Sequence, residues 1–315
     1  MYIESLELKN YRNYEALNIQ FDPGTNILLG DNAQGKTNIL ESMYLAGTTK
    51  SHRGSKDRDI IRFGEEESHI RLFLMREGIR HKIDMHLKKN KSKGAAIDGL
   101  PIRKASELFG LIHFVFFSPE DLNIIKNGPH ERRKFMDSEL CQINRLYLMQ
   151  LSGYNKVVLQ RNKLLKDLSF SDRMRDTLDI WDQQMISYGQ GIIGEREAFI
   201  RQVNSVLKEI HKNITGGREE IELIYEPNVK KEELGQKLLQ ERERDLRQKI
   251  STVGPHRDDF CVMVNGIDIR KFGSQGQQRS AALSLKLSEI DLVRSMIHDQ
   301  PVLLLDDVLS ELDSS

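Results

Sequence analysis

The sequence predicts an α/β protein in which a strand-rich part carries a phosphate-binding loop and a second part is helical. Three observations support this prediction. Residues 30–37 read GDNAQGKT and fit the pattern GxxxxGK[ST]. Strand and hairpin patterns dominate the first 118 residues, whereas apolar positions recur every three or four residues from about Pro129. A chain of 315 residues also has room for about two domains.

Short strands and one helix are expected in the first part. Strand patterns cover residues 3–8 and 17–21, and a buried apolar strand is expected at 26–29, directly before the loop. A helix should follow at about 36–45. Alternating segments at 70–75 and 81–87 flank Glu77-Gly78, which predicts an antiparallel hairpin with a polar outer face.

Two long amphipathic helices are expected in the second part. Their apolar seams comprise positions 140, 143, 147, 151, 154 and 158, then 178, 181, 185, 188, 192, 199, 203, 206 and 210. The polar segment 166–172 is the natural reversal, so the helices should pair antiparallel. Forty helical residues reach about 60 Å, which makes a lobe rather than a rod-like arm.

Strand patterns return near the end of the sequence. They cover 221–225, 259–264 and 267–269, with Asn265-Gly266 as a hairpin turn between the last two. A helix should cover about 275–298, and the apolar run 302–305 should be a strand that ends at Asp306 and Asp307. Three segments are therefore expected: residues 1–118, a helical lobe at 119–248, and 249–315.

The loop at 30–37 has the chemistry of a phosphate cradle. A strand before it and a helix after it would aim backbone N–H groups, and the positive end of the helix dipole, at a phosphate. Lys36 is expected to reach the β- and γ-phosphates, and the Thr37 hydroxyl to ligate Mg²⁺. The predicted nucleotide-binding residues are Gly30, Asp31, Asn32, Ala33, Gln34, Gly35, Lys36 and Thr37.

Two further segments fit that loop. Asp306 should orient Mg²⁺ and Asp307 should polarise the attacking water, since two acids follow an apolar strand. Residues 272–279 read FGSQGQQR and open a helix, so the Ser274 hydroxyl and nearby N–H groups would form a second anion site. A second γ-phosphate site within one subunit would be redundant, which suggests that it completes the nucleotide site of another subunit.

These segments resemble those of ABC-type ATPases related to SMC proteins. Residues 30–37 look like Walker A, 274–277 like the ABC signature, 306–307 like Walker B and 310–313 like the D-loop. Across essentially the whole chain, the sequence is similar to the RecF family of bacterial recombination proteins. That similarity also rests on segments 8–14, 118–122, 132–137, 254–259 and 274–279.

The resemblance implies an ABC-type P-loop ATPase head with a mixed sheet core, an antiparallel hairpin region and a helical second lobe. It implies a cytoplasmic, ATP-dependent homodimer with weak, DNA-dependent ATPase activity. Such a protein acts in recombinational DNA repair, the SOS response and replication-fork maintenance, and helps to load RecA at gapped DNA with RecO and RecR. Arg12 and Asn13 would lie near the nucleotide, together with Ser274, Gly276 and Gln277 of the signature.

The sequence departs from the family pattern in three places. No glutamine stands at 118–121, where the Q-loop is expected, so coupling of that loop to Mg²⁺ is not predicted. Asp307 occupies a position where transporters commonly carry Glu; because its side chain is one methylene shorter, slow hydrolysis is expected. The sequence ends at Ser315, directly after the D-loop, which suggests a shortened chain that lacks a further strand and a switch segment.

The charges are balanced overall but unevenly distributed. Lysine and arginine total 47, as do aspartate and glutamate, so no global field attracts polyanions. Residues 80–104 hold eight cations against two acids, and 50–62 add Lys50, Arg53, Lys56, Arg58 and Arg62. The eight are Arg80, Lys82, Lys88, Lys89, Lys91, Lys93, Arg103 and Lys104. We expect contacts to the phosphates of duplex, gapped or junction DNA, although each lysine alone also fits a solvated hairpin tip.

Other classes of site are not expected. Cys141 and Cys261 lie far apart, which excludes a CxxC metal motif, and His81 and His86 share neither a helix face nor a strand face. We therefore predict no metal site formed by protein ligands alone. No secretory signal or membrane-spanning stretch is found. An ATPase subunit of an ABC transporter is the alternative function, and a nucleotide-gated binding module with incidental hydrolysis is a third.

Overall fold

The computed structural model describes residues 1–104, 107–168 and 176–307. The chain divides into two compact units, one formed by Met1–Pro119 with Val293–Ser315 and the other by Glu120–Leu292. The three-segment division expected from the sequence stays a prediction. Residues 169–172 of the expected helix reversal lie outside the described residues, as do residues 310–313 of the expected D-loop.

A six-stranded antiparallel sheet forms most of the first unit. Its strand order is β2-β1-β3-β4-β5-β6. The bounds are β1 Tyr2–Tyr11, β2 Tyr14–Gln20, β3 Glu67–Arg76, β4 Ile79–Lys88, β5 Lys91–Ile97 and β6 Leu100–Pro101. Glu77 and Gly78 both have positive φ, 51° and 78°, as a two-residue type I′ turn requires. The expected hairpin is therefore confirmed.

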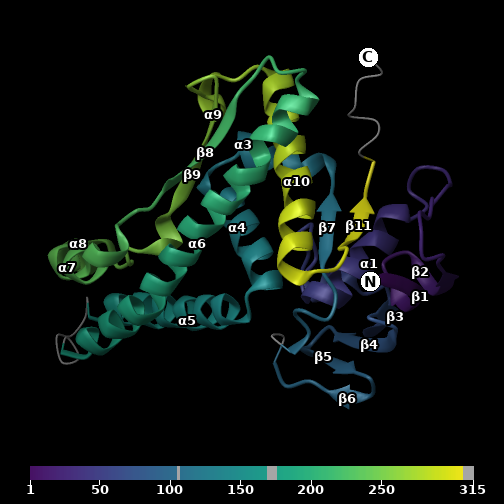
Figure 1. Cartoon of the computed structure of the whole chain (residues 1–315). Helices are drawn as coiled ribbons and strands as arrows, with labels where there is room; N and C mark the ends of the chain where they lie inside the picture. The colour runs from purple at the N-terminus through teal and green to yellow at the C-terminus, as the bar shows by residue number, and fades with distance from the viewer. Residues whose placement is uncertain (105–106, 169–175, 308–315) are drawn as a thin grey trace. The chain divides into compact units, whose positions relative to one another are not determined.

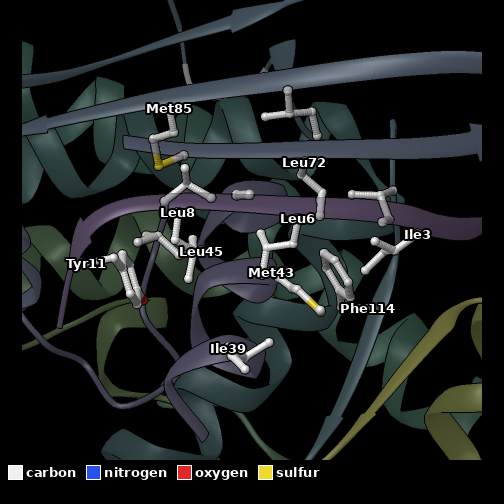
Figure 2. Packing of buried hydrophobic residues seen from close by; sticks show 14 of the residues in the cluster. Ile3, Leu6, Leu8, Tyr11, Ile39, Met43, Leu45, Leu72, Met85 and Phe114 are labelled. Atoms are coloured by element: carbon white, nitrogen blue, oxygen red, sulfur yellow. The ribbon is translucent and has the colours of Figure 1, made fainter. Parts of the chain in front are cut away.

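One face of this sheet packs on helix α1, Lys36–Thr48. Alternate residues of β3 are buried, so one side of the strand faces the core and the other faces solvent. Figure 2 shows Leu6 and Leu8 of β1 pointing toward Met43 and Leu45 of the helix. Burial of each such side chain contributes about 1.5–3 kcal/mol, and this core therefore holds the helix that begins at the phosphate loop.

A parallel pair of strands lies beside α1. β7, Phe114–Phe117, pairs with β11, Val302–Leu305, and Figure 1 shows the two arrows side by side. A Cβ atom added at Gly47 would lie 2.4 Å from the Phe114 ring, so glycine allows α1 to approach β7 closely. The backbone N–H of Asp306 donates to Phe117 O over 2.9 Å, which places the acids at the carboxyl ends of both strands.

The prediction of a buried strand at 26–29 was wrong. No strand is assigned at these positions, and Ile27 and Leu29 are 76% and 88% exposed. Leu303 and Leu305 of β11 are also substantially exposed. An apolar run is buried only if other elements cover both of its faces, and the described part of the chain covers these side chains only in part.

The second unit combines helices with a three-stranded sheet of order β10-β9-β8. The strands are β8 Ile221–Glu226, β9 Asp259–Val264 and β10 Ile267–Asp268. The helices are α3 Asn123–Lys126, α4 Pro129–Ile143, α5 Arg145–Asp167, α6 Leu178–Ile214, α7 Leu234–Gln240, α8 Arg242–Gln248, α9 Ile269–Phe272 and α10 Gln275–Ile297, whose last residues belong to the first unit. The remaining short helix, α2, covers Asp57–Ile60 in the first unit.

The antiparallel pairing of the long helices is confirmed. Tyr147 near the start of α5 contacts Arg196 of α6, whereas Arg161 near the end of α5 contacts Asp182, earlier in α6. Two details differ from the prediction. Asn144 interrupts the first seam, because its side chain accepts from Tyr147 N and caps a new helix. Ile269 begins helix α9 rather than extending a strand, since the Asp268 side chain caps that helix.

Buried ion pairs join the two motif segments 132–137 and 254–259. Arg196, which is 1% exposed, donates to Asp137 Oδ1 and Asp258 Oδ2 over 2.8 and 3.0 Å. Arg132 binds both carboxylate oxygens of Asp259, at 2.6 and 3.0 Å. Buried charges require such partners, so these residues hold the second unit together.

His256 in the same region makes the stability of this unit depend on pH. Its Nδ1 lies 2.8 Å from the Tyr154 hydroxyl and its Nε2 3.0 Å from Ser251 O. Burial lowers the pKa of His256 to about 4. Between the ordinary histidine value and that pKa the unfolded chain binds more protons than the folded chain, so stability falls as pH decreases, by up to about 1.4 kcal/mol per pH unit.

The ordinary pKa of histidine is about 6.5, and that of His256 is lowered to about 4. Between these two pH values we therefore expect the unfolding free energy of the His256→Gln variant to fall less than that of the parent. Urea unfolding at several pH values measures the difference. Exposed His130 on α4 provides the control, and His130→Gln should retain the parent's slope. Equal slopes in all three proteins would contradict a neutral, buried His256.

Candidate phosphate-binding site

The glycine-rich loop ends where α1 begins, at Lys36. Gly30, Ala33 and Gly35 have positive φ angles of 153°, 66° and 100°, which wrap the backbone around the helix N-terminus. Lys36 Nζ donates to the loop carbonyls Gly30 O and Asp31 O over 2.6 and 2.9 Å. Because Gly35 at the N-cap has no capping side chain, the first N–H groups of the helix can donate to an anion.

The turn between β1 and β2 supports the loop from one side. Asn13 Nδ2 and the Tyr14 hydroxyl both donate to Gln34 O, over 3.0 and 3.1 Å. Asn38 Nδ2 of α1 donates to Asn13 Oδ1 over 2.9 Å. A Cβ atom at Gly35 would lie 2.6 Å from Asn13 Oδ1, so only glycine fits between the turn and the helix. Asn13 was predicted from the sequence; Tyr14 and Asn38 were missed, although Tyr14 lies in the motif segment 8–14.

Thr37 and Asp306 meet although 269 positions separate them. Thr37 Oγ1 donates to Asp306 Oδ1 over 2.8 Å. In an octahedral site with Mg–O bonds of 2.0–2.1 Å, neighbouring ligand oxygens lie about 2.9 Å apart. The two oxygens therefore fit adjacent ligand positions on Mg²⁺. Asp307 follows with a left-handed backbone, φ 53°, and this turns the chain away from the strand direction.

Arg12 anchors the turn and does not contact the loop through any of its described hydrogen bonds. Its guanidinium donates to both oxygens of Glu41, over 2.9 and 2.7 Å, to Ser55 Oγ and to Asp59 O. Burial would raise the pKa of Glu41, but hydrogen bonds from Arg12 and Ser51 outweigh it and the pKa is lowered. The buried carboxylate is therefore charged and holds Arg12 beside α1. No sequence pattern indicated this partner.

The signature segment begins α10 in the second unit. Ser274 Oγ accepts from Gln277 N over 3.2 Å, and Gln277 Oε1 accepts from Ser274 N over 3.1 Å, so the two residues cap each other. Ser274, Gln275 and Gly276 are exposed. This capping leaves the Ser274 hydroxyl hydrogen and the N–H of Gly276 able to donate to an external anion. The site at 30–37 lies in the other unit.

The expected Q-loop segment, residues 118–121, overlaps a short 3₁₀ helix, Pro119–Leu122, which is separated from the end of β7 by one residue. The structure thus brings together the loop, Asn13, Thr37 and Asp306 within the first unit. The capping residues Ser274 and Gln277 form a separate group in the second.

Most cations of the hairpin segment pair with acids. Five of the eight form ion pairs at 2.6–3.5 Å: Arg80 with Glu4, Lys82 with Asp84, Lys88 with Glu67, Lys89 with Glu66 and Lys93 with Asp57. Lys91, Arg103 and Lys104 are exposed and form no ion pair within the described residues. Lys93 also donates to Thr49 O, which brings β5 beside the segment that carries Lys50, Arg53 and Lys56. The excess positive charge is therefore concentrated in Lys50, Arg53, Lys56, Lys91, Arg103 and Lys104.

Together, the fold and the loop define an ABC-type P-loop ATPase head. The sequence profile of the RecF/RecN/SMC N-terminal domain matches residues 2–315. A protein of Lachnoclostridium phytofermentans, named DNA replication and repair protein RecF, is 58% identical over 99% of this chain and 87% of its own length. A protein of the same name from Clostridium botulinum is 45% identical over 100% of this chain and 87% of its own length. The chain belongs to the RecF family.

Solved structures confirm the predicted fold class. A structure described as the recombination mediator protein RecF-ATP in the RecFOR pathway has a TM-score of 0.95 and 36% identity over 99% of this chain and 86% of that chain. An Smc head domain from Pyrococcus furiosus has a TM-score of 0.52 at 15% identity, over 98% of this chain and 91% of its own, and shows the fold alone. Among the described helices, none is both long and apolar enough to cross a bilayer.

Replacing Gly35 should destabilise the protein more than replacing a glycine in open space. We expect Gly35→Ala to cost about 2–4 kcal/mol, because a left-handed backbone disfavours alanine and Asn13 blocks its methyl group. Gly54 has φ +71° and nothing within 4 Å of an added Cβ. Gly54→Ala should cost only about 1–2 kcal/mol. Denaturant unfolding followed by circular dichroism compares the two, and equal losses would contradict the proposed steric role of Asn13.

Proposed function

We propose that the chain binds ATP with Mg²⁺ at the loop 30–37 and acts as an ATP-dependent DNA-binding protein in DNA repair. The observation that carries this proposal is the contact of Thr37 with Asp306, which joins the phosphate loop to the acidic strand end. A related protein of 36% identity is described as RecF-ATP. The relatives named as DNA replication and repair proteins favour this function over that of a transporter subunit.

Each residue of the site has a defined role in this proposal. N–H groups of Gly30, Asp31, Asn32, Ala33, Gln34 and Gly35 surround the β-phosphate. Lys36 exchanges its two carbonyl partners for phosphate oxygens, which carry more charge. Thr37 and Asp306 hold Mg²⁺, which offsets phosphate charge when bound. Asn13 keeps the loop in position, and Arg12 holds the turn that carries Asn13.

Asp307 is proposed to orient and polarise the attacking water. A carboxylate can accept a proton from water and is expected directly after the residue that holds Mg²⁺. Because aspartate is one methylene shorter than glutamate, its oxygen must reach further to the water. We therefore infer weak hydrolysis that limits how long the nucleotide complex lasts, and we propose separately that DNA stimulates it.

The complete site is proposed to require a second copy of the chain. The Ser274 hydroxyl, the Gly276 N–H and the Gln277 side-chain Nε2 of the partner subunit would cap the γ-phosphate, since the reciprocal cap uses the Gln277 backbone N–H but none of these donors. The interface of a symmetric dimer presents the same surface twice, so two nucleotides would be enclosed. ATP would then stabilise the dimer by mass action, and hydrolysis would release it.

DNA is proposed to bind through the exposed cations Lys50, Arg53, Lys56, Lys91, Arg103 and Lys104. Contacts of this kind recognise the phosphate backbone and carry little sequence information. A structure of 36% identity is assigned to the RecFOR pathway. We propose that this chain likewise acts with RecO and RecR in the cytoplasm and helps to load RecA at gapped DNA.

ATP should convert the parent from a 36.4 kDa monomer into a dimer of twice that mass, measured by light scattering. Lys36→Ala should fail to dimerise because it binds ATP poorly. Ser274→Ala should bind ATP and yet stay monomeric. An equimolar mixture of these two variants should dimerise, since the loop of one and the signature of the other form one intact composite site.

Asp307→Asn is the control for this experiment, because it should bind ATP and retain the dimer for longer than the parent. A mixture that stays monomeric while the parent dimerises would exclude a site shared between subunits. A parent that stays monomeric with ATP would overturn the proposal of nucleotide-dependent dimerisation.

Removal of the unpaired cations should weaken DNA binding more than removal of paired ones. We expect the triple variant with Lys91, Arg103 and Lys104 changed to Gln to bind gapped duplex more weakly. The slope of log K against log salt should fall by about 1 for each DNA phosphate that the variant no longer binds. The matched control changes Arg80, Lys88 and Lys89, which pair with acids. Mobility shifts at several salt concentrations compare the two, and equal effects would contradict the proposed surface.

A further inference from the structure

Three potential metal ligands lie together on the outer face of the six-stranded sheet. Strand pairing places His69 of β3 directly opposite His86 of β4. Their rings stack with centroids 3.9 Å apart and planes 21° from parallel. Glu67 lies two residues before His69, so its side chain is on the same face of the strand. This face is opposite to the one that packs on α1, where Ile70 and Met85 are buried.

The ligand atoms lie near the spacing that a tetrahedral site requires. Nε2 of His86 lies 3.0 Å from Glu67 Oε2, and Nε2 of His69 lies 3.7 Å from Glu67 Oε1. One ligand atom from each of the three residues lies within 4.8 Å of the others. Ligands bound at 2.0–2.1 Å in a tetrahedron are about 3.3 Å apart. Because the lone pair of each imidazole nitrogen lies in its ring plane, the two stacked rings would have to rotate apart so that all three ligand atoms point at one ion.

We propose that Glu67, His69 and His86 bind a divalent transition metal ion, Zn²⁺ in particular, with water as the fourth ligand. Two imidazoles and one carboxylate suit Zn²⁺, whereas Mg²⁺ prefers oxygen ligands. This site is thus chemically distinct from the pair of oxygens at Thr37 and Asp306. A bound ion would cross-link β3 to β4 and stabilise the sheet.

The surroundings allow an ion to enter but limit its affinity. Side chains of Glu67, His69 and His86 are 48%, 46% and 33% exposed, so solvent reaches them directly. Gly94 of β5, which pairs with His86, has nothing within 4 Å of an added Cβ and leaves open space beside the imidazole. Lys88 Nζ lies 3.5 Å from Glu67 Oε2 and competes for the carboxylate. Removing this competitor should therefore tighten binding.

The test measures metal binding directly on the full chain without nucleotide. After treatment with a chelator and its removal, titration with Zn²⁺ should show one site per chain that His69→Gln and His86→Gln weaken about tenfold or more. Lys88→Gln should strengthen binding. Co²⁺ in the same site should give the intense visible absorption of tetrahedral coordination, and Zn²⁺ should raise the melting temperature of the parent but not of the histidine variants.

His81 provides the matched control, because it is on the same strand as His86 but pairs with Asp98 at 2.9 Å. His81→Gln should bind Zn²⁺ as the parent does. Circular dichroism checks that every variant is folded. Absence of stoichiometric binding, equal weakening in His81→Gln, or unchanged affinity in both His69 and His86 variants would each overturn the assignment.

Discussion

The hydrogen bond between Thr37 and Asp306 is the contact on which the site depends, because it joins two segments that are 269 positions apart. α1 can present its N-terminus only because its apolar face packs on β1 and β3, and because Gly47 allows it to approach Phe114 closely. Asp306 reaches Thr37 because β11 pairs in parallel with β7. The site therefore depends on the whole core of the first unit.

Polar side chains then set the precise arrangement of the loop. Asn13 and Tyr14 share one acceptor, Gln34 O, and the space between the turn and the helix admits only a glycine at 35. Arg12 holds the turn through the buried carboxylate of Glu41. Because the carboxylate keeps its charge through these hydrogen bonds, the contact orders the turn without leaving a buried charge unpaired.

The second unit uses buried charge in a different way. Arg132 of α4 binds Asp259, the first residue of β9, and Arg196 of α6 binds Asp258 directly before it, so both helices are joined to the start of that strand. On α10, Lys286 Nζ lies 2.6 Å from Glu289 Oε2, and both side chains are buried. The helix that the signature segment starts therefore carries a buried ion pair within its own middle turns.

The sequence by itself determined the elements whose signals are local. The loop pattern, the start of α1 at Lys36, the Glu77-Gly78 turn and strand β9 were all predicted, because each depends on neighbouring residues. The loop motif and the acidic end of the last strand also predicted that Thr37 and Asp306 would share one site, and the family resemblance added Asn13.

Tertiary structure decided everything that depends on partners distant in the sequence. Residues 26–29 read as a buried strand, yet whether an apolar run is buried depends on what covers it. Glu41 could not be identified as the partner of Arg12, and His69 and His86 are neighbours only through strand register. Spacing along the chain reports helix and strand faces, whereas burial, ion pairing and cross-strand contact are properties of the packed molecule.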